Sequence, residues 1–132
     1  MTIFVDTSAF YAVFDRSDPN HLEARETWNT LLRGQATLLT TNYVLLETAA
    51  LLQHRIGIGA VRSFHQDVSA LLQVDWVTRE RHHAAMEALL AASRKKLSLV
   101  DCLSFQTMRR FSVHTAFCFD RHFSEQGFST KP

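Results

Sequence analysis

Near the N-terminus the chain reads Ile3-Phe4-Val5-Asp6-Thr7-Ser8. Three consecutive apolar residues with high β propensity predict a strand that is covered on both faces, because a half-exposed strand would alternate apolar and polar residues. Asp6 can cap a helix that starts at Thr7 and carries apolar side chains as far as Phe14. This stretch therefore predicts a buried strand, a turn and a helix.

The same order of strand and helix recurs along the chain. Further strands are predicted at residues 37–40, 74–77 and 116–119. Helices are predicted at residues 21–33, 42–54, 60–72, 78–93 and 98–111. Short strands separated by helices indicate a three-layer α/β/α domain with a central, mainly parallel sheet of four to five strands. Periodicity assigns several large side chains to the core, namely Leu22, Trp28, Leu32, Trp76 and Leu90.

The composition is that of a globular protein. Of the 132 residues 46% are hydrophobic, and 4 Gly and 2 Pro leave little room for linkers, so we expect one domain over residues 1–132 and exclude disordered, collagen-like and repeat proteins. The formal net charge of +1 predicts no general attraction to nucleic acid, so any RNA contact must come from a local patch.

Neither a signal peptide nor a membrane span is expected. Cys102 and Cys118 stand in apolar surroundings without metal-ligand spacing, which favours buried, reduced thiols and a cytoplasmic protein.

Two acidic residues directly follow predicted strands. Asp6 comes after the first strand and Asp120 after the last. Since the carboxyl ends of parallel strands meet at one edge of a sheet, both side chains are expected at that edge, where α/β proteins bind their ligands. The alternative interpretations are a helix cap for Asp6 and a turn residue for Asp120.

Two more acidic residues lie near the start of apolar helices. The helical neighbours of Glu47 are apolar or aromatic, so its carboxylate requires a cation, a metal ion or a water-filled cleft. An ion pair with an arginine is the structural alternative. Asp101 has the spacing of a capping box with Ser98, and the helix dipole at this position also favours an ionised carboxylate.

Together the four acids predict a metal site. Asp6, Glu47, Asp101 and Asp120 would repel one another if they converged, and Mg²⁺ or Mn²⁺ would relieve that repulsion with oxygen ligands. Such an ion lowers the pKa of its water and neutralises charge on phosphoryl oxygens, which predicts phosphodiester hydrolysis. Asp75 is outside this pattern, and Asp75→Asn is expected to have no effect.

Four short motifs, in this order and at these spacings, resemble those of PIN-domain nucleases and, more narrowly, of VapC-type toxins from toxin-antitoxin pairs. They are Val5-Asp6-Thr7-Ser8, Thr41-Asn42-Tyr43-Val44-Leu45-Leu46-Glu47-Thr48, Ser98-Leu99-Val100-Asp101-Cys102 and Phe119-Asp120-Arg121-His122-Phe123. The resemblance implies a Mg²⁺- or Mn²⁺-dependent endoribonuclease that leaves a 5′-phosphate and a 3′-hydroxyl. It also implies that Asp6, Glu47, Asp101 and Asp120 form the metal site, supported by Thr7 or Ser8. The family often has Ser or Thr where this chain has Cys118.

The resemblance also implies partners. We expect an RNA substrate, a homodimer and a small antitoxin protein whose C-terminal segment lies in the acidic groove. Some of the early aromatic residues are expected to face such a partner, namely Phe10, Tyr11, Phe14 and Trp28.

The basic run Arg94, Lys95 and Lys96 is a possible RNA contact, with a solvated helix end as the alternative. His122 is expected at the surface or in a cap, with an approach to the acidic site beside Asp120 as the alternative. The alternative function is a catalytically weak PIN module that acts by binding RNA or protein.

Overall fold

Five parallel strands form the central sheet of the computed structural model, which describes residues 1–132. They are β1 (Thr2–Val5), β2 (Thr37–Thr41), β3 (Leu72–Asp75), β4 (Thr115–Phe117) and β5 (Ser129–Lys131). Their order in the sheet is β3-β2-β1-β4-β5, and each neighbouring pair is parallel. The chain extends the sheet on one side of β1 and then returns to add β4 and β5 on the other. The gap beyond the carboxyl ends of β1 and β4 is thus a topological switch point, where α/β sheets bind ligands.

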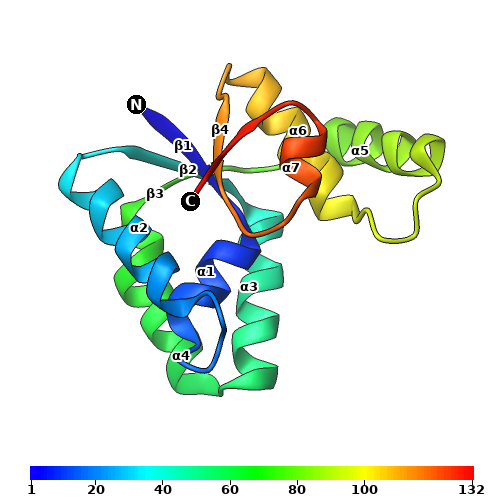
Figure 1. Ribbon diagram of the computed structural model, residues 1–132. Helices are drawn as coiled ribbons and strands as arrows, with labels where there is room; N and C mark the ends of the chain where they lie inside the picture. Colours follow the sequence, from blue (N-terminus) through cyan, green and yellow to red (C-terminus); the bar gives the residue numbers. More distant parts are fainter.

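Helices cover both faces of this sheet. Figure 1 shows one group of helices below the sheet, comprising α1 (Thr7–Phe14), α2 (His21–Arg33), α3 (Asn42–Arg55) and α4 (Ile58–Ser63). The other group comprises α5 (Arg79–Ala92), α6 (Leu99–Arg110) and α7 (His122–Glu125). The predicted three-layer arrangement with a parallel sheet is confirmed. No helix in the structure combines the length and apolar character needed to span a bilayer.

Local sequence explains where the main helices begin. Thr41, Thr78 and Ser98 each occupy the N-cap position and accept a hydrogen bond from a backbone N–H in the first turn of α3, α5 and α6. These contacts satisfy N–H groups that have no partner within the helix. The apolar strands β1 and β2 are buried between the helical layers, as their unalternated sequences predicted.

The segment after α4 differs from the prediction. In place of one helix over residues 60–72, α4 ends at Ser63 and continues as a π-helical turn (Phe64–Val68) and a 3₁₀ turn (Ser69–Leu71). The wider π turn changes the angular spacing of the side chains, so that Phe64 and Val68 are buried while Leu71 is exposed. Strand β3 then begins at Leu72, two residues before the predicted strand over residues 74–77.

Several side chains assigned to the core are exposed. Trp76 lies beyond the end of the shifted strand β3 and is 69% exposed. Leu22 is 83% exposed, because α2 packs through Ala24 and Trp28 and Leu22 lies on the opposite face of the helix. Leu32 and Leu90 are exposed as well, so for these four residues the prediction was wrong.

Some of the early aromatic residues were expected to face a partner, but the structure leaves little of their surface exposed. Phe10, Tyr11 and Trp28 are buried. Phe14 is partly buried, and its ring packs edge-on against Phe64. The helices α1 and α2 and the π-helical turn therefore bury these aromatic rings against one another.

The C-terminal region adds two elements that the sequence pattern did not predict as such. Strand β4 covers residues 115–117, whereas a strand over residues 116–119 was predicted. The helix α7 and the strand β5 follow it. Strand β5 is polar and has no apolar alternation, and it pairs with β4 at one edge of the sheet. Strand β5 joins the sheet through backbone hydrogen bonds, and a pattern of side chains does not reveal such pairing.

Candidate active site

Asp6 lies at the switch point, immediately after β1. It is 4% exposed, and its Oδ2 accepts hydrogen bonds from the backbone N–H of Ser8 (3.2 Å) and from the Ser8 hydroxyl (2.7 Å). The first of these bonds is the helix cap that was the alternative interpretation of Asp6. The other carboxylate oxygen, Oδ1, makes no hydrogen bond to the protein, so Asp6 can cap α1 and still offer an oxygen ligand.

Asp101 is held by the predicted capping box. Its Oδ2 accepts a hydrogen bond from the backbone N–H of Ser98 (3.1 Å), and the Ser98 hydroxyl accepts one from the backbone N–H of Asp101 (3.0 Å). The carboxylate is buried at the start of α6 and has no lysine or arginine in salt-bridge contact. Burial raises the pKa of Asp101, and the neighbouring carboxylate of Asp120 raises it further.

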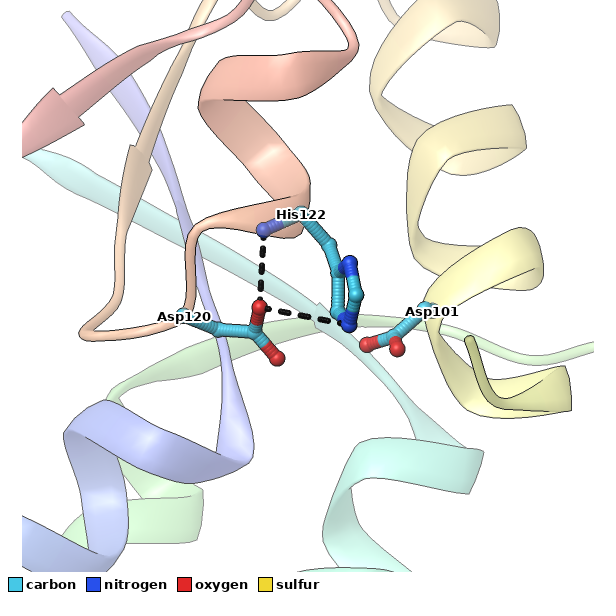
Figure 2. A group of neighbouring side chains, drawn as sticks. All are labelled: Asp101, Asp120 and His122. Atoms are coloured by element: carbon cyan, nitrogen blue, oxygen red, sulfur yellow. Dashed lines mark hydrogen bonds and ion pairs between the residues drawn. The ribbon is translucent and has the colours of Figure 1, made fainter. Parts of the chain in front are cut away.

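Asp120 and His122 complete a cluster with Asp101. One ligand atom from each of the three side chains lies within 4.8 Å of the others. Figure 2 shows the three side chains gathered around one point. Asp120 Oδ1 accepts a hydrogen bond from the backbone N–H of His122 (2.7 Å) and lies 3.8 Å from its Nε2. A surface or capping role was expected for His122, with an approach to the site beside Asp120 as the alternative. The structure supports the alternative, because the ring lies beside two acids. Its position two residues after Asp120 was the only signal in the sequence.

The carboxylates of Asp6, Asp101 and Asp120 interact electrostatically. Burial raises the pKa of Asp6 to about 7. The charges of Asp101 and Asp120 also raise this pKa, whereas the hydrogen bonds from Ser8 lower it. Three carboxylates that are gathered in this way, two of them buried, make the site electronegative. A cation bound there would reverse the upward pKa shifts by favouring the ionised forms.

Glu47 is outside the group of three that Asp101, Asp120 and His122 form. It is half-buried in the second turn of α3, and its carboxylate makes no hydrogen bond or ion pair. The arginine pair that would explain Glu47 as a structural residue is therefore absent. The next residue, Thr48, donates a hydrogen bond to the Thr7 hydroxyl (3.5 Å), which ties α3 to the start of α1 beside Asp6. Glu47 thus remains a candidate ligand on a helix that contacts the site.

The two supporting residues differ in what they contact. The Ser8 hydroxyl donates to Asp6 and accepts a hydrogen bond from the backbone N–H of Phe119 (3.0 Å). It therefore links Asp6 to the loop that carries Asp120. The Thr7 hydroxyl contacts Thr48 and no acid of the site, so its effect on the carboxylates is indirect.

Cys118 occupies the position where the resemblance led us to expect Ser or Thr. Its thiol is buried and donates a hydrogen bond to the backbone carbonyl of Asp120 (Sγ to O, 3.7 Å). Burial and the nearby Asp6 carboxylate raise its pKa to about 12, so the group stays a neutral thiol. The thiol thus donates to the backbone of Asp120, although an S–H group is a weaker hydrogen-bond donor than a hydroxyl. Both cysteines are buried and unpaired, as predicted.

Asp75 has a structural role that the sequence analysis missed. Its Oδ2 lies 2.7 Å from Arg81 Nη1 and accepts a hydrogen bond from the Thr107 hydroxyl (3.0 Å). Arg81 also donates to Thr107 (2.7 Å), so the three side chains join the end of β3 to α5 and α6. Because Asp75 and Arg81 are largely buried, the prediction that Asp75→Asn has no effect does not fit this geometry.

The basic run Arg94, Lys95 and Lys96 lies in the exposed loop between α5 and α6. Arg94 is paired with Glu125 of α7 (3.0 Å), and both side chains remain partly open to solvent. The loop precedes the helix that carries Asp101, and its partner Glu125 lies in the same short helix as His122.

Comparisons with known proteins agree with this geometry. The PIN domain family model matches residues 3–129. The chain is 35% identical over 127 residues to the 23S rRNA-specific endonuclease VapC20 from two strains of Mycobacterium tuberculosis, which covers 96% of this chain and 95% of the relative. The crystal structure of M. tuberculosis VapC20, described as a Sarcin-Ricin loop cleaving toxin, matches with a TM-score of 0.87 and 32% identity over 98% of this chain and 99% of that one. The resemblance drawn from the four motifs is confirmed, and the chain belongs to the PIN domain family, with VapC toxins among its relatives.

Proposed function

We propose that this protein is a metal-dependent endoribonuclease of the VapC toxin type, which hydrolyses RNA phosphodiester bonds. The observation that carries the proposal is the cluster of Asp101 and Asp120 at the switch point of a PIN-domain fold, where Ser8 links buried Asp6 to the loop that carries Asp120. The similarity to VapC20, which is named as a 23S rRNA-specific endonuclease, supports RNA as the substrate class. An RNA loop whose bases are unstacked is the form that such an enzyme can reach most easily.

The donor set of the site suits a divalent cation. Asp6 and Asp101 are buried acids without a basic partner, and buried carboxylates of this kind are normally paired or bound to metal. Asp6, Glu47, Asp101 and Asp120 would hold Mg²⁺ or Mn²⁺, which prefer oxygen ligands. When bound, such an ion neutralises charge on the phosphoryl oxygens and lowers the pKa of the attacking water.

The residues of the chain orient the acids and move a proton. Ser8 fixes Asp6 and the loop that carries Asp120, and Ser98 fixes Asp101. We assign proton removal from the attacking water to one of the carboxylates and favour Asp101. The expected products carry a 5′-phosphate and a 3′-hydroxyl. Arg94, Lys95 and Lys96 would hold phosphates of the RNA.

A catalytically weak module that only binds RNA or protein is the second candidate. The replacement of a family Ser or Thr by Cys118 is the observation that favours it. The hydrogen bond from Cys118 to the Asp120 loop and the presence of all four acids favour the enzyme instead. Cleavage of RNA by purified protein, which should depend on added metal, distinguishes the two.

Metal ions are expected to stabilise the fold and to be required for cleavage. Because the empty carboxylates repel one another, Mg²⁺ or Mn²⁺ should raise the melting temperature by several degrees and restore cleavage after chelation. Ca²⁺ should bind and support little turnover. Thermal unfolding and RNA cleavage, measured with each ion and with EDTA, check this. Equal cleavage in excess EDTA would rule out the proposed chemistry.

We also propose a homodimer, an antitoxin partner and action in the cytoplasm, where RNA is available and the two thiols stay reduced. Exposed Leu46 and Trp76 help to line a largely apolar hollow of about 430 Å³ between α3 and the π-helical turn. Large exposed apolar side chains around one hollow favour contact with another protein chain. We assign this hollow to the second copy and the acidic site to the antitoxin, whose basic groups would pair with the carboxylates.

Co-purification tests these partners. The product of the small reading frame immediately upstream, if that frame encodes a DNA-binding protein, should co-purify with this chain and reduce RNA cleavage and Mn²⁺ binding together, because it occupies the acidic groove. Sedimentation of the free chain should give a dimer. A tightly bound partner that leaves RNA cleavage unchanged would contradict the proposed mode of inhibition.

A further inference from the structure

The position of His122 is not explained by a site made of carboxylates alone. Its side chain is only 15% exposed, and its Nε2 faces the acids, 3.8 Å from Asp120 Oδ1. Figure 2 shows the ring standing between the carboxylates of Asp101 and Asp120. A capping role needs only the backbone N–H of His122, which already donates to Asp120. The imidazole must therefore have a separate reason to be there.

The far side of the ring supplies a second observation. The Nδ1 atom of His122 is buried and has no hydrogen-bond partner. The nearest acid on that side is Glu125, one turn further along α7, with Oε1 3.8 Å from Nδ1. Glu125 is itself held by Arg94 at 3.0 Å. A metal-binding histidine commonly donates its second ring N–H to a carboxylate, which fixes the tautomer and the ring orientation.

We infer that His122 is a nitrogen ligand of the metal ion through Nε2, beside the oxygen ligands Asp101 and Asp120, with Glu125 as the residue that orients the ring. This inference rests on the proposed metal-dependent function. With the proton on Nδ1, facing Glu125, the lone pair of Nε2 is directed toward the acids. Ligands of one octahedral ion lie about 3.0 Å apart when adjacent and about 4.2 Å apart when opposite. The three ligand atoms, which lie within 4.8 Å of one another, would therefore move closer together by rotation of their side chains to share an ion.

A nitrogen ligand changes which ions the site prefers. Imidazole binds transition-metal ions well, whereas Mg²⁺ and Ca²⁺ favour oxygen. We therefore expect Mn²⁺ and Co²⁺ to bind more tightly than Mg²⁺, and the advantage of Mn²⁺ over Mg²⁺ to shrink when the imidazole is removed.

The rival explanation is that His122 is a cation that pairs with the acids and takes the place of a metal ion. The two explanations predict opposite effects of His122→Gln on metal affinity. If His122 is a ligand, Mn²⁺ binding should weaken by at least about tenfold. If it is a competing cation, Mn²⁺ binding should become tighter, because the substitution removes a positive charge from the site.

The experiment uses the full-length protein and Mn²⁺ as the probe. Pulsed electron paramagnetic resonance on the wild-type complex should show a directly coordinated nitrogen-14, and His122→Gln should abolish that signal. Calorimetry should give the expected loss of Mn²⁺ affinity for His122→Gln. His114→Gln is the matched control, since His114 is an exposed histidine whose side chain makes no hydrogen bond or ion pair, and it should retain both the signal and the affinity.

The wild-type spectrum decides the question even if the variant folds poorly. Absence of nitrogen coupling at saturating Mn²⁺, or tighter Mn²⁺ binding by a folded His122→Gln variant, would overturn the assignment of His122. Wild-type protein that binds Mn²⁺ without nitrogen coupling and still cleaves RNA would remove this ligand and leave the proposed function standing. Wild-type protein that neither binds Mn²⁺ nor cleaves RNA would remove both.

Discussion

Asp6→Asn should reduce RNA cleavage by at least about a hundredfold while the protein stays folded. Asn keeps the volume of Asp and caps a helix equally well, so the cap on α1 is preserved. What is lost is a charged oxygen at the site, which weakens the binding of a hard cation and the activation of water. Cleavage of the same RNA at saturating Mg²⁺ measures the effect. Asp101→Asn, Asp120→Asn and Glu47→Gln should behave alike.

The same substitution should change how stability depends on pH. The pKa of Asp6 in the folded protein is raised to about 7, from 3.8 for an ordinary aspartate. The folded state therefore binds the proton more tightly than the unfolded state does. The stability that this proton contributes is lost as the pH rises from about 4 through 7. Without metal, Asp6→Asn should lack this part of the decline and be the more stable protein at pH 8. Urea unfolding in EDTA at pH 5 and pH 8 checks this.

The control for Asp6→Asn is Asp67→Asn. Asp67 is an exposed acid in the π-helical turn and has no side-chain hydrogen bond or ion pair, so its loss should alter neither cleavage nor the pH dependence. Asp75→Asn is not a suitable control, because Asp75 forms a largely buried ion pair with Arg81. Wild-type turnover by Asp6→Asn would leave Asp6 as a helix cap only.

The second large effect is expected on stability, from Arg81→Met. This change removes the cation and leaves the Asp75 carboxylate largely buried with only the Thr107 hydroxyl as its partner. Breaking a buried ion pair on one side costs about 3–5 kcal/mol. Urea unfolding should show a loss of this size in the free energy of unfolding.

Two further variants define the origin of that loss. The double variant Asp75→Leu with Arg81→Met should lose less stability than Arg81→Met alone, because no unpaired charge remains. Arg79→Met, at an exposed arginine in the first turn of the same helix, should change the free energy of unfolding by less than about 0.5 kcal/mol. An equal loss from Arg79→Met and Arg81→Met would show that the ion pair contributes nothing specific.

The parts of the fold that depend on local chemistry followed from the sequence. The apolar strands β1 and β2, the cap of α1 by Asp6, and the capping box of Ser98 and Asp101 each involve residues that are close in the chain. Burial of an unalternated strand requires helices on both faces, so the three layers and the parallel sheet followed as well. The elements that the sequence did not predict are those that depend on distant partners. Strand β5 forms through backbone pairing with β4, and the π-helical turn after α4 changes which side chains reach the core.

For the site, the sequence determined the residue types and their places at strand ends and helix starts. The acids Asp6, Asp101 and Asp120 could be selected because a carboxylate beside an apolar strand or at the start of an apolar helix needs a partner. Only the tertiary structure decided which of the candidates converge. It brought Asp101, Asp120 and His122 together, without Glu47 in that group, and paired Asp75 with Arg81. The physical reason is that the distance between side chains on different elements depends on strand order and helix packing, which no pattern within one segment specifies.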